Sequence, residues 1–293
     1  MEGHYVKNAM QKKLKNKEKW YCRWAPSLGD LEDTPENIWG TLQYDPNKHI
    51  DKSVVFCGLY GLPDFYALWK HRGKKVAWWA GSDILHFKKG YYLDDAGDIR
   101  VDNKALGQWI NKYCENWCEN DVEQEELKKF GIFAKVCPSF LGDVKKFSVE
   151  YKHNERPKLY TSVSGDNFEQ YGWHLISGLA KANRDVEFHL YGNQKKYYSP
   201  YKNVFVHGRV PKEQMNEEIK EMQGALRLTT FDGFSEILAK SILWGQWPVS
   251  LIGYPYMLPV DKIMMLKNMK EPNTRGREYY LNHINKFPWN TKI

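Results

Sequence analysis

The feature that most constrains the fold is a regular alternation of short apolar runs with amphipathic segments, which begins at Ser53. The run "SVVFCGLYG" ends in glycines and precedes "LPDFYALWKHRG", whose apolar residues recur near helical spacing. Such alternation is typical of parallel sheets joined by crossover helices, and it argues against a β-sandwich or a helix bundle. The sequence therefore predicts an α/β fold.

The same pattern continues to the end of the first half. Further strands are predicted in "KKVAWWAGSD" and "AKVCPSF". Helices are predicted in "NKALGQWINKYC" and "DVEQEELKKFGI", the second with Asp121 as N-cap and Gly131 as C-cap. A first α/β unit would thus end near Phe140.

The second half repeats this style after a polar segment, Leu141 to Pro157, which suits a linker between domains. Strands are predicted in "KLYTSVSG", "VEFHLYGN", "NVFVHGRV", "ALRLTT" and "WPVSLIG". Helices are predicted in "NFEQYGWHLISGLAKA", in "PKEQMNEEIKEMQ", from about Ser235 to Leu243, and finally in "NTRGREYYLNHINKF". A length of 293 residues suits two domains, and we expect Rossmann-like domains at 1–150 and 151–293.

The charge balance favours anionic partners. Lys and Arg outnumber Asp and Glu by 43 to 36, a net charge of +7. The densest basic stretch, Lys7 to Trp24, leads into Trp20, Tyr21 and Trp24. Basic residues with interleaved aromatics can bind nucleic acid, and a solvated helix whose aromatics dock on the domain explains the same residues. Both interpretations stay open.

Cysteine usage and the hydropathy pattern favour a cytoplasmic protein. The five cysteines, an odd number without metal-binding spacing, are expected to be free thiols (Cys22, Cys57, Cys114, Cys118 and Cys137). No run approaches the roughly 18 apolar residues of a membrane span, and the N-terminus lacks the apolar core of a secretory signal. We therefore expect a cytoplasmic location and no transmembrane segment.

Candidate ligand-binding residues are given by the expected topology. In open parallel sheets, ligands bind outside the carboxyl ends of the strands. Most of the loops expected there lie in the second half, and several place glycine beside a polar residue, as close approach of an anion requires. The second half is therefore predicted to bind a nucleotide through Ser164, Gly165, Tyr191, Gly192, His207, Gly208 and Arg209.

The stretch "LRLTTFDGFSEILAKSILWGQWPVS" carries the strongest of these signals. Arg227 lies on a predicted strand and is a natural phosphate ligand. Gly233, Phe234 and Ser235 open a helix whose N-terminal amides would point at a diphosphate. Asp232, too near to be the partner of a diphosphate, is expected to face sideways toward sugar hydroxyls.

This stretch resembles the C-terminal domain of GT-B glycosyltransferases, in particular the retaining families with an E-x7-E motif. In "DGFSEILAKSILWGQWPVS", Asp232 stands at the first acidic position and Gly245 ends the helix. The second acidic position is Lys240, so the carboxylate that holds the donor ribose in the family is absent, and Glu236 is a local candidate to replace it. The glycine-rich loop usual in the N-terminal domain is not evident, which predicts a shortened N-terminal domain.

The resemblance implies a nucleotide-diphosphate sugar as donor, and it gives the N-terminal half the acceptor. In "WWAGSD", Gly81 and Ser82 could approach the acceptor and Asp83 could deprotonate or orient it. Asp83 is explained equally well as a helix cap, whereas Asp64 is expected to be a cap. Asp83 and Asp232 are the candidate catalytic residues. No metal site is suggested and no cofactor is expected, because helix N-termini and basic side chains can neutralise the leaving diphosphate.

The sequence therefore predicts a glycosyltransferase that moves a hexosyl or pentosyl group, with a UDP-sugar as the first choice of donor. A glycan or lipid-linked acceptor is the default expectation. Two alternatives stay open: transfer to a hydroxymethylated DNA base by a basic enzyme of this fold, and a non-catalytic nucleotide-sugar-binding protein.

Overall fold

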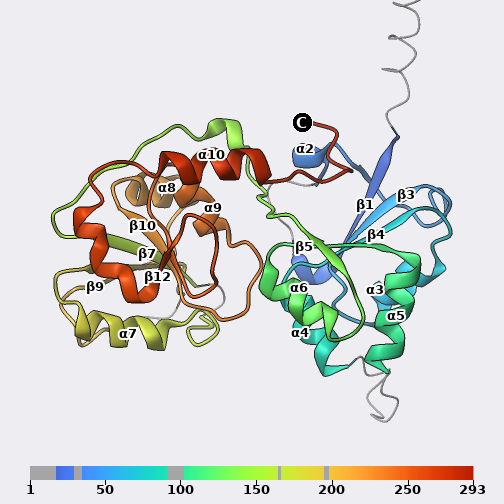
Figure 1. Cartoon of the computed structure of the whole chain (residues 1–293), viewed down its shortest axis with the longest axis horizontal. Coiled ribbons are helices and arrows are strands. Elements are labelled where there is room, and N and C mark those ends of the chain that lie inside the picture. The colour runs from blue at the N-terminus through green and yellow to red at the C-terminus, as the bar shows by residue number, and fades with distance from the viewer. Residues whose placement is uncertain (1–17, 30–34, 91–101, 164–165, 195–197, 293) are drawn as a thin grey trace, which may run out of the picture. The chain divides into compact units, whose positions relative to one another are not determined.

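The protein is described by a computed structural model that covers residues 18–29, 35–90, 102–163, 166–194 and 198–292. It divides into unit 1, Met1–Cys137 with Asn285–Ile293, and unit 2, Pro138–Ile284. Each unit holds a six-stranded sheet with helices (Figure 1), which confirms the α/β class. The sequence placed the domain boundary at residue 150 and residues 285–293 in the second domain, whereas the structural division falls at Cys137 and returns those residues to unit 1.

Unit 1 contains a fully parallel sheet with the strand order β2-β1-β3-β4-β5-β6. Its strands are β1 (Trp20–Trp24), β2 (Leu42–Gln43), β3 (Ser53–Cys57), β4 (Lys75–Trp78), β5 (Glu115–Cys118) and β6 (Ala134–Val136). Its helices are the short 3-10 helix η1 (Pro26–Leu28) and α2 (Pro35–Trp39), α3 (Leu62–Lys70), α4 (Ser82–Lys89), α5 (Asn103–Tyr113) and α6 (Asp121–Lys128). All five residues of the apolar strand β3 are buried, as expected for a central parallel strand.

The sequence did not predict three strands of unit 1, which are β1, β5 and the two-residue β2. The aromatic end of the basic stretch, for which a docked helix was one interpretation, is strand β1, which pairs with β2 and β3 and buries Trp20 and Cys22. The polar segment "ENWC" is β5 and alternates between half-buried and buried residues. The helix interpretation of the stretch is therefore wrong for residues 20–24, while residues 1–17 lie outside the described part of the chain.

The caps of unit 1 were predicted in part. Asp64 is a helix cap, as expected, and accepts hydrogen bonds from the amides of Tyr60 and Gly61 at the start of α3. The N-cap of α6 is Asn120, which accepts from the Glu123 amide at 3.0 Å, and not Asp121, the next residue. The C-cap of α6 is Lys129, and Gly131 follows it with a φ of +78°.

The C-terminal segment completes the core of unit 1. Trp289 is fully buried and Phe287 nearly so, and their rings stack with centroids 4.5 Å apart. Both rings contact Trp39, and the amide of Thr291 donates to the Trp39 carbonyl at 2.8 Å. This contact explains why a segment so late in the sequence belongs to the first unit.

Unit 2 contains a second fully parallel sheet, ordered β12-β11-β10-β7-β8-β9. Its strands are β7 (Lys158–Ser162), β8 (Glu187–Tyr191), β9 (Val204–Gly208), β10 (Gly224–Arg227), β11 (Val249–Ser250) and β12 (Leu258–Pro259). Its helices are η2 (Val144–Lys146), α7 (Trp173–Ala182), α8 (Lys212–Lys220), α9 (Glu236–Leu243), η3 (Val260–Asn268) and α10 (Thr274–His283). The predicted strands, the helix beginning near Ser235 and the final helix are all present.

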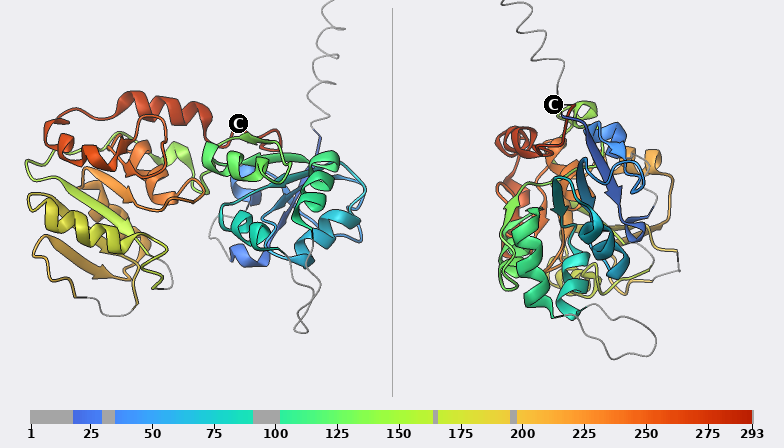
Figure 2. Two further views of the ribbon diagram at one scale, coloured as in Figure 1. Left: turned by 60° about the horizontal axis from the view of Figure 1, so that its bottom comes forward. Right: turned by 90° about the vertical axis from the view of Figure 1, so that its right-hand side faces the viewer.

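The sheet of unit 2 has an apolar core on each face. Neighbouring residues of β7 point to opposite faces, so that Tyr160 joins the cluster around α9 and α10 and Leu159 joins the cluster around α7. Figure 2 shows the yellow α7 and the red α10 on opposite sides of this sheet.

The segment from Leu141 to Pro157, expected as a linker, is instead packed on unit 2. The Glu150 amide donates to the Trp244 carbonyl at 3.0 Å, and the Phe147 ring lies 5.0 Å from that of Trp244. Arg277 of α10 donates to the Phe147 carbonyl at 2.7 Å. Apolar residues spaced among its lysines anchor this polar-looking segment.

Candidate functional site

The candidate site of unit 2 lies where β7, β8, β9 and β10 end. The strands are parallel, so their carboxyl ends share one edge, and the predicted donor-binding residues of the last three strands gather there. Ser164 and Gly165, which follow β7, lie outside the described residues. The edge therefore brings together the turns after β8, β9 and β10.

Arg227, at the end of β10, is paired with Asp232. The Asp232 Oδ2 atom lies 2.7 Å from Nε and 2.6 Å from Nη2 of Arg227. The guanidinium also lies over the Tyr171 ring, 4.3 Å from its centroid. Asp232 therefore faces Arg227 and holds the arginine in a fixed orientation, while its expected contact with sugar hydroxyls stays a prediction.

Gly172 lets the backbone beside Tyr171 lie directly against the end of β10. Its φ is +72°, and a Cβ atom added there would lie 2.3 Å from the Leu228 carbonyl oxygen. Only glycine suits this position. Sequence reasoning missed Tyr171, because Gly172, the residue that marks this close approach, lies inside a segment predicted as a helix.

The turn between β10 and α9 is fixed by apolar contacts. The Phe234 ring stacks on that of Tyr280 with centroids 5.0 Å apart, and the Tyr254 hydroxyl donates to the Gly233 carbonyl at 2.8 Å. Ser235 is the N-cap of α9 and makes no side-chain capping bond. The first turn of α9 is thus held at the sheet edge from behind, with its amides directed along the helix axis.

Two residues considered in place of the second motif carboxylate, Glu236 and Lys240, both form hydrogen bonds within unit 2. Glu236 accepts a hydrogen bond from the Leu141 amide at 2.9 Å. Lys240, in place of the second motif carboxylate, donates to Asn216 of α8 at 3.1 Å. A cation thus stands between α8 and α9, where the family motif has an acid.

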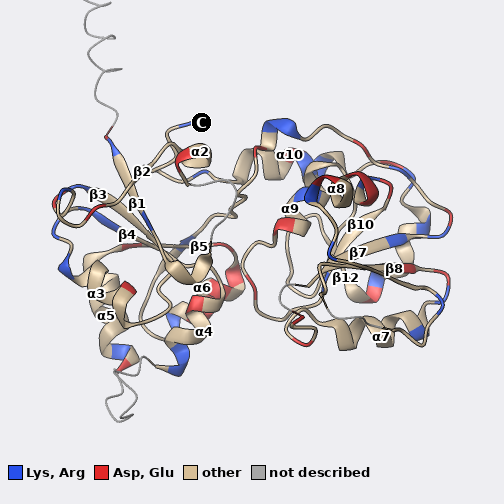
Figure 3. Cartoon of the chain, turned by 180° about the vertical axis from the view of Figure 1, so that it is seen from behind, with Lys and Arg blue, Asp and Glu red and all other residues tan. Residues whose placement is uncertain are grey.

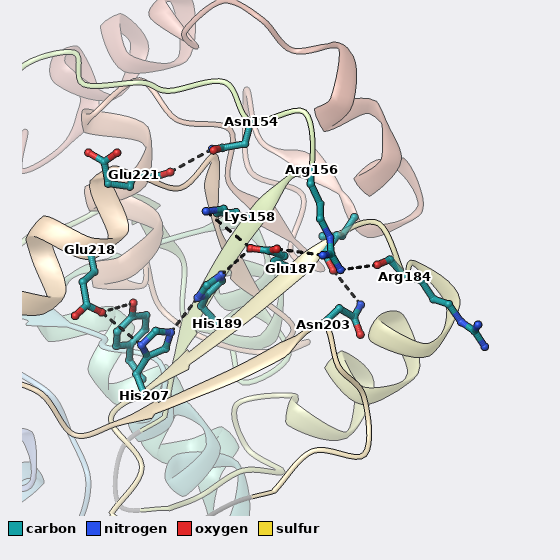
Figure 4. Close-up of polar contacts among 12 residues, drawn as sticks. Asn154, Arg156, Lys158, Arg184, Glu187, His189, Asn203, His207, Glu218 and Glu221 are labelled. Carbon is teal, nitrogen blue, oxygen red and sulfur yellow. Dashed lines mark hydrogen bonds and ion pairs between the residues drawn. The ribbon is translucent and has the colours of Figure 1, made fainter.

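A polar cluster links β8, β9 and α8 (Figure 4). The Tyr191 and His207 rings stack with centroids 4.3 Å apart, and the Tyr191 hydroxyl donates to Glu218 Oε2 at 2.7 Å. The same oxygen lies 3.5 Å from His207 Nδ1. Hydrogen bonds from Gln214 and Tyr191 lower the pKa of Glu218, while burial lowers the pKa of His207. A charged glutamate therefore stands beside a neutral histidine at pH 7.

The cluster extends inward to His189, whose Nδ1 lies 2.9 Å from His207 Nε2. Burial lowers the pKa of His189 to about 4, and its Nε2 faces Glu187 at 3.6 Å. Glu187 is also paired with Arg156 at 3.3 Å. Both ring nitrogens of His207 thus face protein groups, and the contact of its ring with a base, suggested by the sequence, stays a prediction. Sequence reasoning missed Glu218 and His189, which belong to no motif.

Two glycines shape the turns after β8 and β9. Gly192 has a φ of +85°, and a Cβ atom there would lie 2.3 Å from the Val163 carbonyl oxygen. Its amide donates to the Gly208 carbonyl at 2.8 Å, and Gly208 itself has a φ of +75°. The adjacent Arg209 is exposed. The two turns are thus joined through their backbones, with an arginine beside them.

The predicted acceptor residues lie in unit 1, at the carboxyl end of β4. Asp83 is fully buried and accepts hydrogen bonds from the amides of Leu59 at 3.1 Å and Ala80 at 3.0 Å. Burial raises its pKa to about 7. Gly81 has a φ of +90° as the N-cap of α4, and the half-buried Ser82 donates to the Tyr60 hydroxyl at 3.3 Å. Asp83 thus joins the loops after β3 and β4, and Ser82 and Tyr60 are the hydroxyls beside it.

All five cysteines are buried free thiols, as expected. Among the described residues, no group of three or more His, Cys, Asp or Glu side chains could hold a metal ion. No helix in the described part of the chain is both long and apolar enough to cross a bilayer.

Comparison with known proteins rests on structure alone, since no protein-family model and no curated protein sequence matches the chain. The chain is similar to TarM, with a TM-score of 0.51 and 13% identity over 80% of this chain and 52% of TarM. An S. aureus TarM variant in complex with fondaparinux, α-GlcNAc-glycerol and UDP matches equally well. Sucrose-phosphate synthase from Thermosynechococcus elongatus matches with a TM-score of 0.54 and 10% identity over 78% of this chain and 69% of that one.

The chain spans about half the length of TarM. At these identities the comparisons establish the fold and leave the activity to be argued from the site. With its two parallel α/β units and these neighbours, the chain has the fold of the GT-B glycosyltransferases.

Proposed function

We propose that the protein is a glycosyltransferase that moves a sugar from a nucleotide-diphosphate sugar to a hydroxyl group of its acceptor. The GT-B fold supports the reaction class. The UDP bound to the TarM variant supports a UDP-sugar as donor. The observation that carries the proposal is the edge of unit 2, where Arg227, two glycine turns and the start of α9 meet.

Each of these parts suits a diphosphate. Arg227 has five N–H donors, of which Nε and Nη2 contact Asp232. We assign its Nη1 group to a donor phosphate. The amides of the first turn of α9 add positive potential, and the backbones at Gly192 and Gly208 allow a nucleotide to approach closely.

These groups also account for departure of the diphosphate. Negative charge grows on the leaving oxygen as the bond to the sugar breaks, and fixed donors that point at this charge stabilise the transition state. Arg227 and the α9 amides would supply this stabilisation without a metal ion. Asp232 keeps Arg227 oriented, and its half-buried side chain lies where it could also accept from a sugar hydroxyl.

Unit 1 would then hold the acceptor, a glycan or a lipid-linked sugar. Asp83 is too deeply buried to reach an acceptor directly, so we assign it to positioning the loops that carry Ser82 and Tyr60. Transfer of a hexosyl or of a pentosyl group satisfies the site equally.

The test is release of nucleoside diphosphate from UDP-, GDP- and ADP-sugars, each alone and with glycan, lipid-linked and hydroxymethylated duplex DNA acceptors. We expect release from one donor class, accelerated by a glycan or lipid-linked acceptor. Acceleration by the modified DNA alone would contradict the acceptor assignment. Donor binding without any release or transfer would contradict enzymatic activity.

The matched variants are Arg227→Ala and Arg184→Ala, the second at an exposed arginine of unit 2 on the helix-to-strand turn before β8. Loss of a charged hydrogen bond in the transition state should lower kcat/KM roughly ten- to hundredfold in Arg227→Ala. Arg184→Ala should match the wild type. Equal rates in both variants, with the fold intact, would refute the role of Arg227.

A further inference from the structure

The outer surface of unit 1 carries exposed aromatic rings beside lysines. Tyr66 and Trp69 of α3 are 51% and 53% exposed, and Tyr113 of α5 is 49% exposed. Exposed apolar side chains that gather in one patch mark an interaction surface, whereas single exposed rings are common on any protein. We call the set the aromatic–lysine patch; it consists of Tyr66, Trp69, Lys70, Trp109, Lys112 and Tyr113.

The two helices present the patch in the same way. Tyr66, Trp69 and Lys70 occupy positions i, i+3 and i+4 of α3, and Trp109, Lys112 and Tyr113 occupy the same positions of α5. Residues at this spacing share one helix face. Figures 1 and 3 show α3 and α5 side by side in unit 1.

The two faces are joined into one surface. The Phe65 ring of α3 meets the Trp109 ring of α5 with centroids 5.5 Å apart. Lys75 donates to the carbonyl of His71, just after α3, at 2.6 Å, and its Nζ lies 5.3 Å from the centre of the Trp109 ring. Phe65 and Lys75 therefore bring α3 and α5 together beside the rings of the aromatic–lysine patch.

The charge of the patch is positive. Helices α3 and α5 contain a single carboxylate between them, Asp64, which is buried and paired with Arg23 at 2.8 Å. Lys70, Arg72 and Lys112 are all exposed, whereas Lys74 is paired with Glu18 and lies over the Trp20 ring. Within unit 1, Figure 3 shows acidic residues (red) on α6 instead. An anionic partner is therefore favoured.

The geometry of the rings distinguishes between anionic partners. Tyr66 and Trp69 stack on each other with centroids 5.8 Å apart, and Lys70 lies over the Tyr66 ring at 4.5 Å. Likewise, Lys112 lies over the Tyr113 ring at 5.1 Å. A base stacks on an open ring face, whereas at a bilayer surface tryptophan and tyrosine bury their rings at headgroup level while lysine heads meet anionic lipids.

We propose that the aromatic–lysine patch docks unit 1 on the surface of a bilayer that contains anionic lipids. The rings would enter the headgroup region, and the lysines would pair with lipid phosphates. This inference does not depend on the proposed glycosyl transfer, because docking requires neither donor nor acceptor.

The test is cosedimentation of the full chain with vesicles of phosphatidylglycerol and phosphatidylcholine, and with vesicles of phosphatidylcholine alone. We expect binding to the mixed vesicles that weakens as salt is added. Each lysine near the bilayer surface adds electrostatic attraction to the anionic lipids. We therefore expect Lys70→Gln and Lys112→Gln each to weaken vesicle binding about fivefold. The double variant with Tyr66→Gln and Trp69→Gln should weaken vesicle binding several-fold, and this loss should depend less on salt than the loss caused by the lysine variants.

The controls remove similar groups from unit 2: Lys181→Gln and Lys202→Gln for charge, and Tyr198→Gln, whose ring is 81% exposed. They should bind like the wild type. Equal binding by patch and control variants would overturn the proposal, because the basic N-terminal stretch would then explain the attraction. So would binding to single-stranded DNA but not to vesicles, or self-association that the patch variants abolish.

Discussion

Replacement of Trp289 by alanine tests the assignment of the C-terminal segment to unit 1. Trp289 is fully buried and its ring contacts those of Trp39, Trp117 and Phe287. Burial of a tryptophan side chain removes about 150–250 Å² from water, which is worth about 4–6 kcal/mol before relaxation. Measured losses for aromatic-to-alanine changes in cores are about 3–5 kcal/mol. We therefore expect Trp289→Ala to lower the free energy of unfolding by about 4 kcal/mol.

The assay is urea unfolding followed by tryptophan fluorescence. Nine of the twelve tryptophans lie in unit 1, so the signal reports mainly on that unit (Trp20, Trp24, Trp39, Trp69, Trp78, Trp79, Trp109, Trp117 and Trp289). The matched control is Trp69→Ala in the same unit, at a ring that is 53% exposed, which should cost less than about 1 kcal/mol. A loss below about 1 kcal/mol in Trp289→Ala would refute the claim that residues 285–293 complete the unit 1 core.

Three further predictions concern the loops and the polar cluster. Asp83→Ala leaves the amides of Leu59 and Ala80 without their acceptor and should cost about 2–4 kcal/mol in urea unfolding; an unchanged midpoint would disprove the structural role. Gly192→Ala should lower the free energy of unfolding by at least about 2 kcal/mol because of its positive φ and the close Val163 carbonyl. The control, Gly178→Ala on α7, has open space around the new Cβ atom and should raise that free energy by up to about 1 kcal/mol. Equal effects in both variants would contradict the turn geometry. Burial lowers the pKa of His189 from 6.5 to about 4. Between these pH values the unfolded chain binds a proton at His189 that the folded chain does not. The free energy of unfolding should therefore fall by up to about 3 kcal/mol as the pH drops from 6.5 to about 4. The same titration of His189→Phe should be flatter, and identical curves would count against burial of a neutral imidazole.

The strands and helices of unit 2 were predictable because their periodicity is strong and glycines or prolines separate them. "VEFHLYGN" and "ALRLTT" have the apolar character of strands buried on both faces; β8 lies within the first, and β10 overlaps the second from Ala225 to Arg227. Strand β5 was missed because it is short and carries Glu115 and the buried Asn116, and β1 was missed because Arg23 and the basic residues before it hide its apolar character. Pairing with neighbouring strands decided these segments, and single-sequence patterns do not contain that information.

The location of the candidate site could be predicted from the expected sheet topology, whereas the contacts between its residues could not. The carboxyl edge was identified from the order of strands and glycine turns. The pairing of Arg227 with Asp232 depends on the conformation of the turn between them. A spacing of five residues in the sequence does not determine that conformation. Glu218 reaches the edge from the last turn of α8, and the burial of Asp83 depends on loops from two strands. Such long-range contacts carry no local sequence signal.

The central claim is that a nucleotide diphosphate binds at the carboxyl edge of the unit 2 sheet. Hydrogen–deuterium exchange of the full chain with and without saturating UDP tests it directly. The account predicts slower exchange in the backbone at Gly192, at Gly208 and from Leu228 to Glu236, and a smaller effect in Arg227→Ala at the same UDP concentration. Protection that avoids these segments, or no protection at a UDP concentration that inhibits sugar transfer, would contradict it.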